Sequence, residues 1–551
     1  QGDWSSDVCS SDLMIRTQQD IVLGIDLGTS NSCGYISLNG RPTPVVDETG
    51  SVIIPSLVYY VPGGKPVIGN SAKSMKGKKN LCMNAKRLIG RKWDSEFIGS
   101  IKERCNADLR ENHGFPGFFV PVLDRIVSPK EISVEIIKYI IGCAEKMLNN
   151  THVSKLVVTV PAYFNSDQRN GTRDAALEAS RLSEESVFLL NEPTSAAICY
   201  DLPSMQKKQT IMVYDLGGGT FDVSMIMVEK KEVTVLNTGG DNMLGGDDFT
   251  AIVASLICQV YSQTHEGKEL VPSNTSDKRY QINYRRLLNI AEETKIRLKQ
   301  EKEVSVDLTE ITKEDNSTVK VTETEMNELL RPKIEKTIEI MAKVLQEANK
   351  KKEDIDRVLL VGGSSKLSLV KSMVEAEYGA DHVSCTLDPD QCVAMGAMLY
   401  FKKFGRQIVD NGRKTSQIGA GTQRSNGSTL HEIVNMNLGT RVGPDHRYDI
   451  MIPKGTSVPK TVSKEYAVNN YQTQVKDALF QGEGKYTEEC EEIAPIILTG
   501  ITSAPSGQIT LKYTFTVDYG NVVLCTVEEL PTHRILFGPR KPIRYTEEIG
   551  R

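Results

Sequence analysis

Between Ile21 and about Phe404, short apolar runs alternate with longer stretches in which apolar residues recur every three or four positions. Runs such as IVLGID (21–26) and RVLLV (357–361) have the length and the β-branched content of buried strands. SVEIIKYIIGCAEKML (133–148) has the spacing of an amphipathic helix. This alternation of strands and helices predicts an α/β domain over residues 20–404.

The pattern changes after this domain. Residues 405–433 include a stretch rich in Gly, Ser, Thr, Asn and Arg, which is typical of a linker. Residues 434–530 contain short alternating runs such as GQITLKYTFTVDYGNVVLCTV (507–527), which predict an antiparallel β-domain. Residues 531–551 carry three prolines and mixed charge, so we expect a truncated tail that cannot form a bundle of helices.

Both ends of the sequence look foreign. Residues 8–13 read VCSSDL, and the last four residues are Glu-Ile-Gly-Arg; both can be translations of adapter DNA. We therefore expect residues 1–13 to be a non-native leader, Met14 to be the native start, and the native C-terminus to be missing.

Composition narrows the function classes. The 551 residues are enough for two to four domains, and the net charge of −5 comes from well-mixed signs, which argues against a nucleic-acid binder. The apolar runs have the length of strands, so no membrane span is predicted. The eleven cysteines are scattered and never form a CxxC pair. We therefore expect neither a zinc site nor a disulfide framework, but a cytoplasmic protein with reduced thiols.

A sequence pattern that occurs twice in the chain indicates phosphate binding. Residues 21–36 and 211–226 both read as an apolar strand, then Asp-Leu-Gly, small or hydroxyl residues, and a second apolar strand. This repeated pattern predicts two related lobes that face each other across a cleft. In each turn, glycines let successive backbone N–H groups converge on an anion. The alternative for either motif alone is an ordinary β-hairpin with Asp and Gly at its turn.

The same motifs each begin with an aspartate, Asp26 and Asp215. Two carboxylates facing one cleft could hold a hydrated Mg²⁺, an ion that usually keeps several waters. A third strand ends in Val361-Gly362-Gly363-Ser364, where glycines would let the backbone lie flat against a purine or ribose. Its alternative is a tight strand-to-helix turn with serine as the N-cap. The sequence has no GxxxxGK[ST] run, which excludes a P-loop enzyme.

Eight motifs occur in an order that is highly specific as a set. They are GIDLGTSNSC (24–33), NAKRLIGRK (84–92), VVTVPAYFNSDQRNGTRDA (157–175), LLNEPTSAAICYDL (189–202), YDLGGGTFDVS (214–224), LGGDDF (244–249), LLVGGSSKL (359–367) and DPDQCVAMGAM (388–398). In these motifs the chain resembles the heat shock protein 70 chaperone family, within the actin-like ATPase superfamily. The resemblance implies a two-lobed actin-like (ribonuclease H-like) α/β ATPase domain, followed by a β-sandwich peptide-binding domain whose helical lid is missing here.

The resemblance also implies site residues. The phosphates of ATP or ADP would be held by Gly28, Thr29, Ser30, Asn31, Gly217, Gly218, Gly219 and Thr220. Asp26 and Asp215 would bind the waters of Mg²⁺, and Asp215 would also orient the attacking water. Lys86 matches the family's catalytic lysine, although lysines in such a basic stretch are usually solvated. Glu192-Pro193-Thr194 matches the segment that couples the nucleotide site to the other lobe; alternatively, Pro193 is simply a first helical residue.

The adenosine would lie against Glu292, Lys295 and Lys299, which we expect on one helix face, and against Gly362, Gly363, Ser364 and Lys366. A solvated charged stripe is the alternative for the first three. Two residues depart from the family pattern: Lys299 stands where serine is common, and Lys366 where an arginine often stacks on the base. Lysine lacks the planar guanidinium, so we expect weaker adenine stacking.

The second domain resembles the family less. The expected linker is acidic and leucine-rich, whereas residues 430–434 read LHEIV. Val475 matches a pocket-lining valine, but Thr440 and Gly443 stand where apolar rim residues are expected, which predicts a shallower, more polar groove. The function implied is that of a monomeric ATP-dependent chaperone. Its partners would be unfolded or extended polypeptides, J-domain co-chaperones and nucleotide-exchange factors. The alternative is a non-catalytic nucleotide-binding scaffold or exchange factor of the same family.

Overall fold

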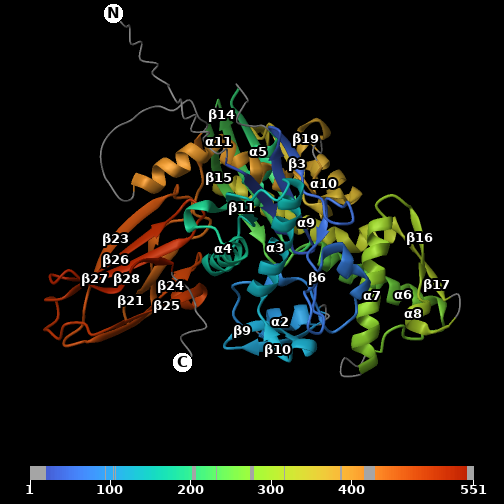
Figure 1. Ribbon diagram of the computed structural model, residues 1–551, viewed down its shortest axis with the longest axis horizontal. Helices are drawn as coiled ribbons and strands as arrows, with labels where there is room; N and C mark the ends of the chain where they lie inside the picture. Colours follow the sequence, from blue (N-terminus) through green and yellow to red (C-terminus); the bar gives the residue numbers. More distant parts are fainter. Residues whose placement is uncertain are drawn as a thin grey trace, which may run out of the picture.

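The computed structural model describes residues 20–542, except 94, 103–104, 106, 201–206, 231, 273–277, 315–316, 385–387 and 415–428. The expected leader (1–13) and the last nine residues lie outside this range. Figure 1 shows two groups of strands and helices around the centre and right of the molecule, and a β-domain, in red, at its left. No helix in the described ranges has both the length and the apolar content to span a bilayer.

The first group is built on a mixed sheet with the order β12-β11-β1-β2-β3, with β4 also paired to β2. Its strands are β1 (Val22–Asp26), β2 (Asn31–Leu38), β3 (Arg41–Pro44), β4 (Ile54–Pro55), β11 (Lys155–Val160) and β12 (Val187–Asn191). Helices α3 (Pro129–Met147) and α4 (Ser166–Ser180) pack on it, and a capping box starts each one: Ser128 with Glu131, and Asn165 with Gln168. The core of this group includes Leu23, Ile36 and Ile140.

The second group repeats this plan. Its sheet has the order β19-β18-β13-β14-β15-β20. The strands are β13 (Gln209–Leu216), β14 (Phe221–Glu229), β15 (Glu232–Asp241), β18 (Arg357–Val361), β19 (Val383–Ser384) and β20 (Thr429–His431). The larger helices are α6 (Gly246–Thr264), α7 (Lys278–Arg297), α9 (Glu323–Glu347) and α10 (Ser368–Tyr378). A separate apolar core that includes Tyr214, Phe249 and Met341 holds them together.

Two helices join the groups. Helices α5 (Glu192–Cys199) and α11 (Cys392–Lys414) share an apolar cluster with residues of both sheets, including Val157 of β11 and Val213 of β13. The backbones of α5 and α11 approach closely at Gly396, where a Cβ would lie 1.8 Å from the Ser195 carbonyl oxygen. Figure 1 shows both helices at the top centre of the molecule.

Smaller elements complete these two groups. They are β5 (Val58–Tyr59), β6 (Val67–Ile68), β7 (Leu81–Cys82), α1 (Ala85–Leu88), α2 (Ser95–Lys102), β8 (Asp108–Asn112), β9 (Phe115–Val120), β10 (Arg125–Val127), β16 (Glu303–Asp307), α8 (Thr309–Thr312) and β17 (Thr318–Thr322).

The β-domain consists of two four-stranded antiparallel sheets around one apolar core. One sheet has the order β22-β21-β24-β25 and the other β23-β26-β27-β28. The strands are β21 (Leu438–Val442), β22 (Arg447–Ile452), β23 (Lys460–Ala467), β24 (Gln474–Gln481), β25 (Glu491–Thr499), β26 (Thr510–Val517), β27 (Val523–Leu530) and β28 (Arg534–Pro542).

Three elements do not fit the domain boundaries expected from the sequence. Helix α11 continues to Lys414, ten positions past the expected end of the first domain. Strand β20 lies within the expected linker and pairs in parallel with β15, so the end of the linker joins the second sheet. Strand β28 lies within the expected tail and pairs with β27. The β-domain therefore extends beyond Leu530.

Candidate functional site

Two β-turns face each other in the cleft between the two sheets. One joins β1 to β2, and the other joins β13 to β14, where the Gly217 N–H donates to the Thr220 carbonyl at 3.0 Å. A Cβ on Gly218 would lie 2.3 Å from Ser30 Oγ, and one on Gly219 would lie 2.8 Å from Thr29 Oγ1. The turns are therefore in direct contact, and any side chain at these glycines would push them apart.

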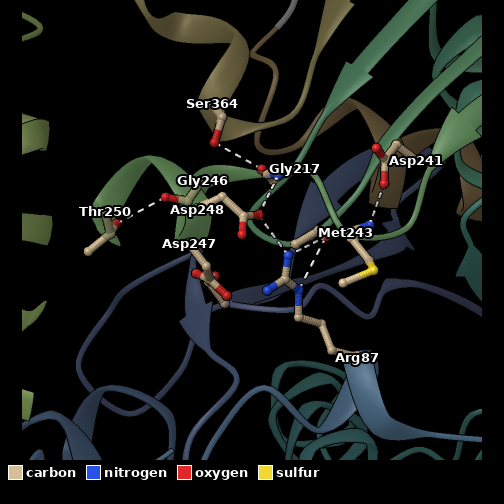
Figure 2. Close-up of polar contacts among 12 residues, drawn as sticks. Arg87, Gly217, Asp241, Met243, Gly246, Asp247, Asp248, Thr250 and Ser364 are labelled. Carbon is tan, nitrogen blue, oxygen red and sulfur yellow. Dashed lines mark hydrogen bonds and ion pairs between the residues drawn. The ribbon is translucent and has the colours of Figure 1, made fainter. Parts of the chain in front are cut away.

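A third turn completes this arrangement. Strand β18 is parallel to β13, and it is followed directly by Gly362, which has φ +81°. A Cβ there would lie 2.4 Å from the Leu216 carbonyl oxygen. Ser364 Oγ, in the 3-10 turn Gly363–Lys366, donates to the Gly217 carbonyl at 2.9 Å (Figure 2). Hydrogen bonding thus ties the third predicted segment to the turn between β13 and β14.

A cavity of about 420 Å³ opens between these turns. Every predicted site residue except Gly219 lines it. They are Asp26, Gly28, Thr29, Ser30, Asn31, Lys86, Glu192, Asp215, Gly217, Gly218, Thr220, Glu292, Lys295, Lys299, Gly362, Gly363, Ser364 and Lys366. Gly219 instead packs against Arg87 and Thr29. The volume lies in the range of small-molecule and cofactor pockets.

One end of the cavity carries buried acidic groups around a single lysine. Lys86 Nζ lies 2.6 Å from Glu192 Oε1, and each side chain is 8% exposed. Burial and the nearby Glu192 carboxylate raise the pKa of Asp26 to about 7. Burial and the same glutamate also raise the pKa of Asp215. Burial alone would lower the pKa of Lys86, but Glu192 and Asp26 outweigh it and raise the pKa.

These raised pKa values test whether a cation fits this end of the cavity. Asp26 and Asp215, with Asp222 behind them, bring more negative charge than Lys86 can balance. A divalent ion would favour the ionised carboxylates. No cluster of three or more His, Cys, Asp or Glu side chains suited to a metal occurs in the described residues. The acid pair therefore suits Mg²⁺ held largely through water better than an ion held directly by several side chains.

Sequence reasoning missed Arg87. Its guanidinium donates to the Gly219 carbonyl at 2.8 and 3.2 Å, and it pairs with Asp248 at 2.9 Å (Figure 2). Arg87 follows Lys86 in the first group, whereas Gly219 and Asp248 belong to the second. The buried guanidinium therefore holds the turn between β13 and β14 against α1. Only the adjacent motif NAKRLIGRK could have signalled this role.

The other end of the cavity is lined by α7 and the third turn. Lys295 Nζ donates to the Gly246 carbonyl and to Thr250 Oγ1, both at 2.7 Å. Glu292 pairs at 3.0 Å with Lys76 from the opposite side of the cleft. Lys366 pairs with Asp388 at 3.1 Å and with Asp390 at 2.6 Å. The predicted charged residues thus form specific contacts, of which the Glu292–Lys76 pair crosses the cleft.

Lys299 differs in position from the expectation. Helix α7 ends at Arg297, so Lys299 lies in the turn after the helix and not on its face. Its ammonium donates to the Gly363 carbonyl at 3.2 Å. Burial and the like charge of Lys295 lower the pKa of Lys299. The half-exposed Ile296, which the sequence analysis did not single out, also lines this end of the cavity.

Comparison with known proteins identifies the family. The sequence model described as "Hsp70 protein" matches residues 22–534. The chain belongs to the Hsp70 family. It is 31% identical over 523 residues to the "Heat shock cognate HSP70 protein" of Trypanosoma brucei brucei, covering 92% of this chain and 73% of that protein. It is 28% identical over 519 residues to "Chaperone protein dnaK1" of a Synechocystis strain, covering 93% of this chain and 70% of that protein.

The family resemblance inferred from the eight motifs is therefore confirmed, and the sequence identities make the chain a divergent member. Hsp70 proteins are chaperones with ATPase activity, which gives the class of protein to which this cavity belongs. The remaining geometry concerns how the cavity connects to the β-domain of this Hsp70.

The segment after Glu192 reaches the linker directly. Thr194 Oγ1, two residues beyond Glu192, donates to Glu432 Oε1 at 2.5 Å, and Asn191 Nδ2 donates to Glu432 Oε2 at 2.9 Å. Glu432 is 4% exposed, and burial raises the pKa of its carboxyl group despite these hydrogen bonds. The linker and the cavity are thus joined through one buried segment.

Further bonds hold the β-domain against the first group. Asn435 Nδ2 donates to the carbonyls of Ala162 and Phe164 at 2.8 and 3.1 Å. Arg169 donates to the Gly520 carbonyl at 3.1 Å, and Asn165 Nδ2 to Glu491 at 2.8 Å. Asn165 both caps α4 and contacts the β-domain.

Proposed function

We propose that this Hsp70 is an ATP-hydrolysing chaperone whose nucleotide state controls how the β-domain docks and binds extended polypeptide. The observation that carries the proposal is one continuous path of buried contacts. Lys86 in the cavity pairs with Glu192, and Thr194 on the same helix bonds Glu432 of the linker. A change in charge around Lys86 that moves Glu192 can therefore be transmitted to the linker through the first turn of α5.

The phosphates of ATP would lie on the two turns, where backbone N–H groups and the hydroxyls of Thr29, Ser30 and Thr220 can donate to them. Asp26 and Asp215 would bind the waters of Mg²⁺, which supplies charge neutralisation on the phosphates when bound. Lys86 would stabilise the negative charge that builds on the γ-phosphate. Asp215 would accept a hydrogen bond from the attacking water and orient it.

At the linker, Glu432 contributes the coupling. Hydrogen bonds to this buried carboxylate favour its ionised form and partly offset the burial that raises its pKa. Asn191 and Thr194 supply those bonds in the docked arrangement. A shift of Glu192 toward or away from Lys86 would move the start of α5 and change this compensation. The two arrangements needed for coupling are therefore a docked and a released linker.

The β-domain would bind extended peptide through backbone hydrogen bonds and a side-chain pocket. Thr440 is 1% exposed and donates to Asp477, so the region expected to be apolar holds a polar pair. Gly443 lies in a turn with φ +72°. These features support the more polar groove expected from the sequence. J-domain proteins and exchange factors are the partners proposed with this activity. The free thiols of all nine described cysteines fit the cytoplasm.

Single-turnover hydrolysis of ATP tests the catalytic part. We expect Lys86→Ala to slow hydrolysis at least about a hundredfold, the usual scale for losing one group that stabilises transition-state charge. Lys79→Ala, an exposed lysine of the same basic stretch, is the matched control and should leave the rate unchanged. Removal of Mg²⁺ with EDTA should abolish hydrolysis. Equal rates for wild type and Lys86→Ala would refute this mechanism and favour a non-catalytic relative.

Binding of a fluorescent apolar peptide with and without ATP tests the coupling. We expect ATP to speed peptide release in the wild type. Peptide binding that is equal in both states would exclude coupling, and no binding in either state would leave only an ATPase.

A further inference from the structure

The part of the cavity away from the phosphate turns has a chemistry that selects among nucleotide bases. This inference rests on the proposed nucleotide site, because it assumes that phosphates occupy the two turns. The base must then lie at the other end, against the last turn of α7 and the turn Gly363–Lys366. Of the α7 residues that line the cavity, Glu292 and Ile296 are four positions apart, which is about 6 Å along a helix and suits the step from ribose to base.

This end of the cavity offers apolar side chains to a base: Ile296 on α7, with Leu367 and Pro389 also among the lining residues. Ile296 is 50% exposed although it lines a cavity, and its neighbours there are mainly polar or charged. An aliphatic side chain gives dispersion contact to any flat base but makes no hydrogen bond. Ile296 therefore contributes affinity without distinguishing one purine from another. Discrimination must come from the polar groups near it.

The cationic groups at this end are not equivalent. The Lys366 ammonium is held by Asp388 and Asp390, and the Lys295 ammonium is held by Gly246 and Thr250. For Lys299, the Gly363 carbonyl is the one hydrogen-bond acceptor found among the described residues. A lysine ammonium carries three N–H donors and no acceptor. Lys299 therefore has donors left for a ligand and can give only donors to it.

Purine bases differ at the position that such a donor would read. Adenine presents a 6-amino group, itself a donor, beside the acceptor N7. Guanine and hypoxanthine present the acceptor O6 beside N7, which is the edge that lysine recognises in nucleic acids. An ammonium that faces the 6-amino group of adenine places a donor against a donor. With adenine, the ammonium can therefore form at most the hydrogen bond to a ring nitrogen.

We propose that Lys299 makes this site a reader of 6-oxopurines, so that the chain binds inosine and guanosine nucleotides at least as tightly as adenosine nucleotides. The partial burial of Lys299 strengthens the effect. An ammonium removed from water gains more from a carbonyl acceptor than a solvated one does. The Gly363 carbonyl keeps the ammonium in place before the base arrives.

Isothermal titration of the full chain with ADP, IDP and GDP in the presence of Mg²⁺ tests the proposal. In the wild type, IDP and GDP should bind at least as tightly as ADP. Lys299→Met keeps the length of the side chain but removes its donors, and it should weaken IDP and GDP about tenfold relative to ADP. Lys302→Met is the control, because Lys302 is exposed and pairs with Glu323 outside the cavity. It should leave the ratio of affinities unchanged.

A second variant protects the test against a folding defect in the first. Lys299→Gln can both donate and accept, and it should bring the affinities for IDP and ADP toward equality while the circular dichroism spectrum stays that of the wild type. A wild type that binds ADP more tightly than IDP, or a ratio that neither variant changes, would overturn the role of Lys299 and leave the ATPase proposal intact. Failure of all three nucleotides to bind would instead overturn the proposed function itself.

Discussion

Lys86 and Glu192 form a buried ion pair that stabilises the fold only while both partners are present. They lie 2.6 Å apart and are each 8% exposed. Removing one partner of such a pair typically costs 3–5 kcal/mol, because the other charge stays buried without compensation. We therefore expect Lys86→Met to lower the free energy of unfolding by about 3 kcal/mol, measured by urea denaturation without nucleotide.

The double variant separates the pair from its surroundings. Lys86→Met with Glu192→Gln removes both charges, so it should be more stable than Lys86→Met alone. A double variant that is less stable than both single variants would show that the pair is not the unit that matters. In that case, the other carboxylates around Lys86, those of Asp26 and Asp215, would dominate its energetics.

Among the elements, the crossing of α5 and α11 is set by one glycine. A Cβ at Gly396 would lie 1.8 Å from the Ser195 carbonyl oxygen, a backbone atom that cannot turn aside. We expect Gly396→Ala to force the helices apart and to lower the free energy of unfolding by about 3 kcal/mol, at the upper end of overpacking costs. Urea denaturation of the full chain measures this change.

Gly142 on α3 is the matched control, because a Cβ there meets no atom within 4 Å. Gly142→Ala should raise the free energy of unfolding by about 0.5–1 kcal/mol, since alanine loses less backbone entropy in a helix. If both substitutions change stability equally, the close approach of α5 and α11 is not a constraint.

The turn between β27 and β28 depends on an ionised carboxylate. Glu529 is 0% exposed. Burial alone would raise its pKa, but hydrogen bonds from the Thr502 N–H, Thr532 and Arg534 outweigh burial and lower the pKa below its usual 4.5. Its contribution is therefore present above pH 4.5 and is lost as the pH falls through the folded-state pKa. Glu529→Gln should lower the opening free energy of this hairpin by about 1.5–3 kcal/mol at pH 7, and by less below pH 4.5.

Hydrogen exchange of the β27 amides measures that opening free energy. Glu465→Gln serves as control, because Glu465 lies exposed on β23. A Glu529→Gln effect that stays constant as the pH falls from 7 through the folded-state pKa would mean that the charge of Glu529 is not the source of the stabilisation.

Sequence patterns predicted some of these elements and missed others. The turns at Gly28 and Gly217 are local signals, since a strand, an aspartate and glycines are adjacent in the chain. The end of α11 was missed because residues 405–414 contain glycines and asparagine, which have low helix propensity. Strand β28 was missed because its two prolines argue against a central strand. It lies at the edge of its sheet, where proline is tolerated.

At the scale of the whole molecule, the contacts that connect the domains could not be predicted. Arg87 and Gly219 lie 132 positions apart, and Thr194 and Glu432 lie 238 apart. No local pattern marks such partners, because their pairing depends on how two sheets and the β-domain come together. The motifs located nearly all of the cavity, since each one contributes a compact turn, but the residues that tie those turns together came only from the structure.

These connecting contacts make the docked arrangement sensitive to one residue. Glu432 is buried and accepts hydrogen bonds from Asn191 and Thr194, while Lys454 pairs at 2.8 Å with Glu347 elsewhere along the interface. Glu432→Ala leaves the two donors unsatisfied at the junction, whereas Lys454→Ala removes two partly exposed ion pairs, to Glu347 and Glu483, each of which contributes at most about 1 kcal/mol. We expect Glu432→Ala to expose the linker near 429–434 to protease in the presence of ATP, and to abolish ATP-driven peptide release. Hydrolysis by the isolated cavity should persist within about threefold, because Glu432 does not line it. Lys454→Ala should change the protease pattern far less.

If Glu432→Ala still releases peptide on ATP addition, the path from Lys86 through α5 is not the route of coupling. Release would then have to pass through the contacts of Arg169 and Asn435, which the Glu432 substitution leaves in place.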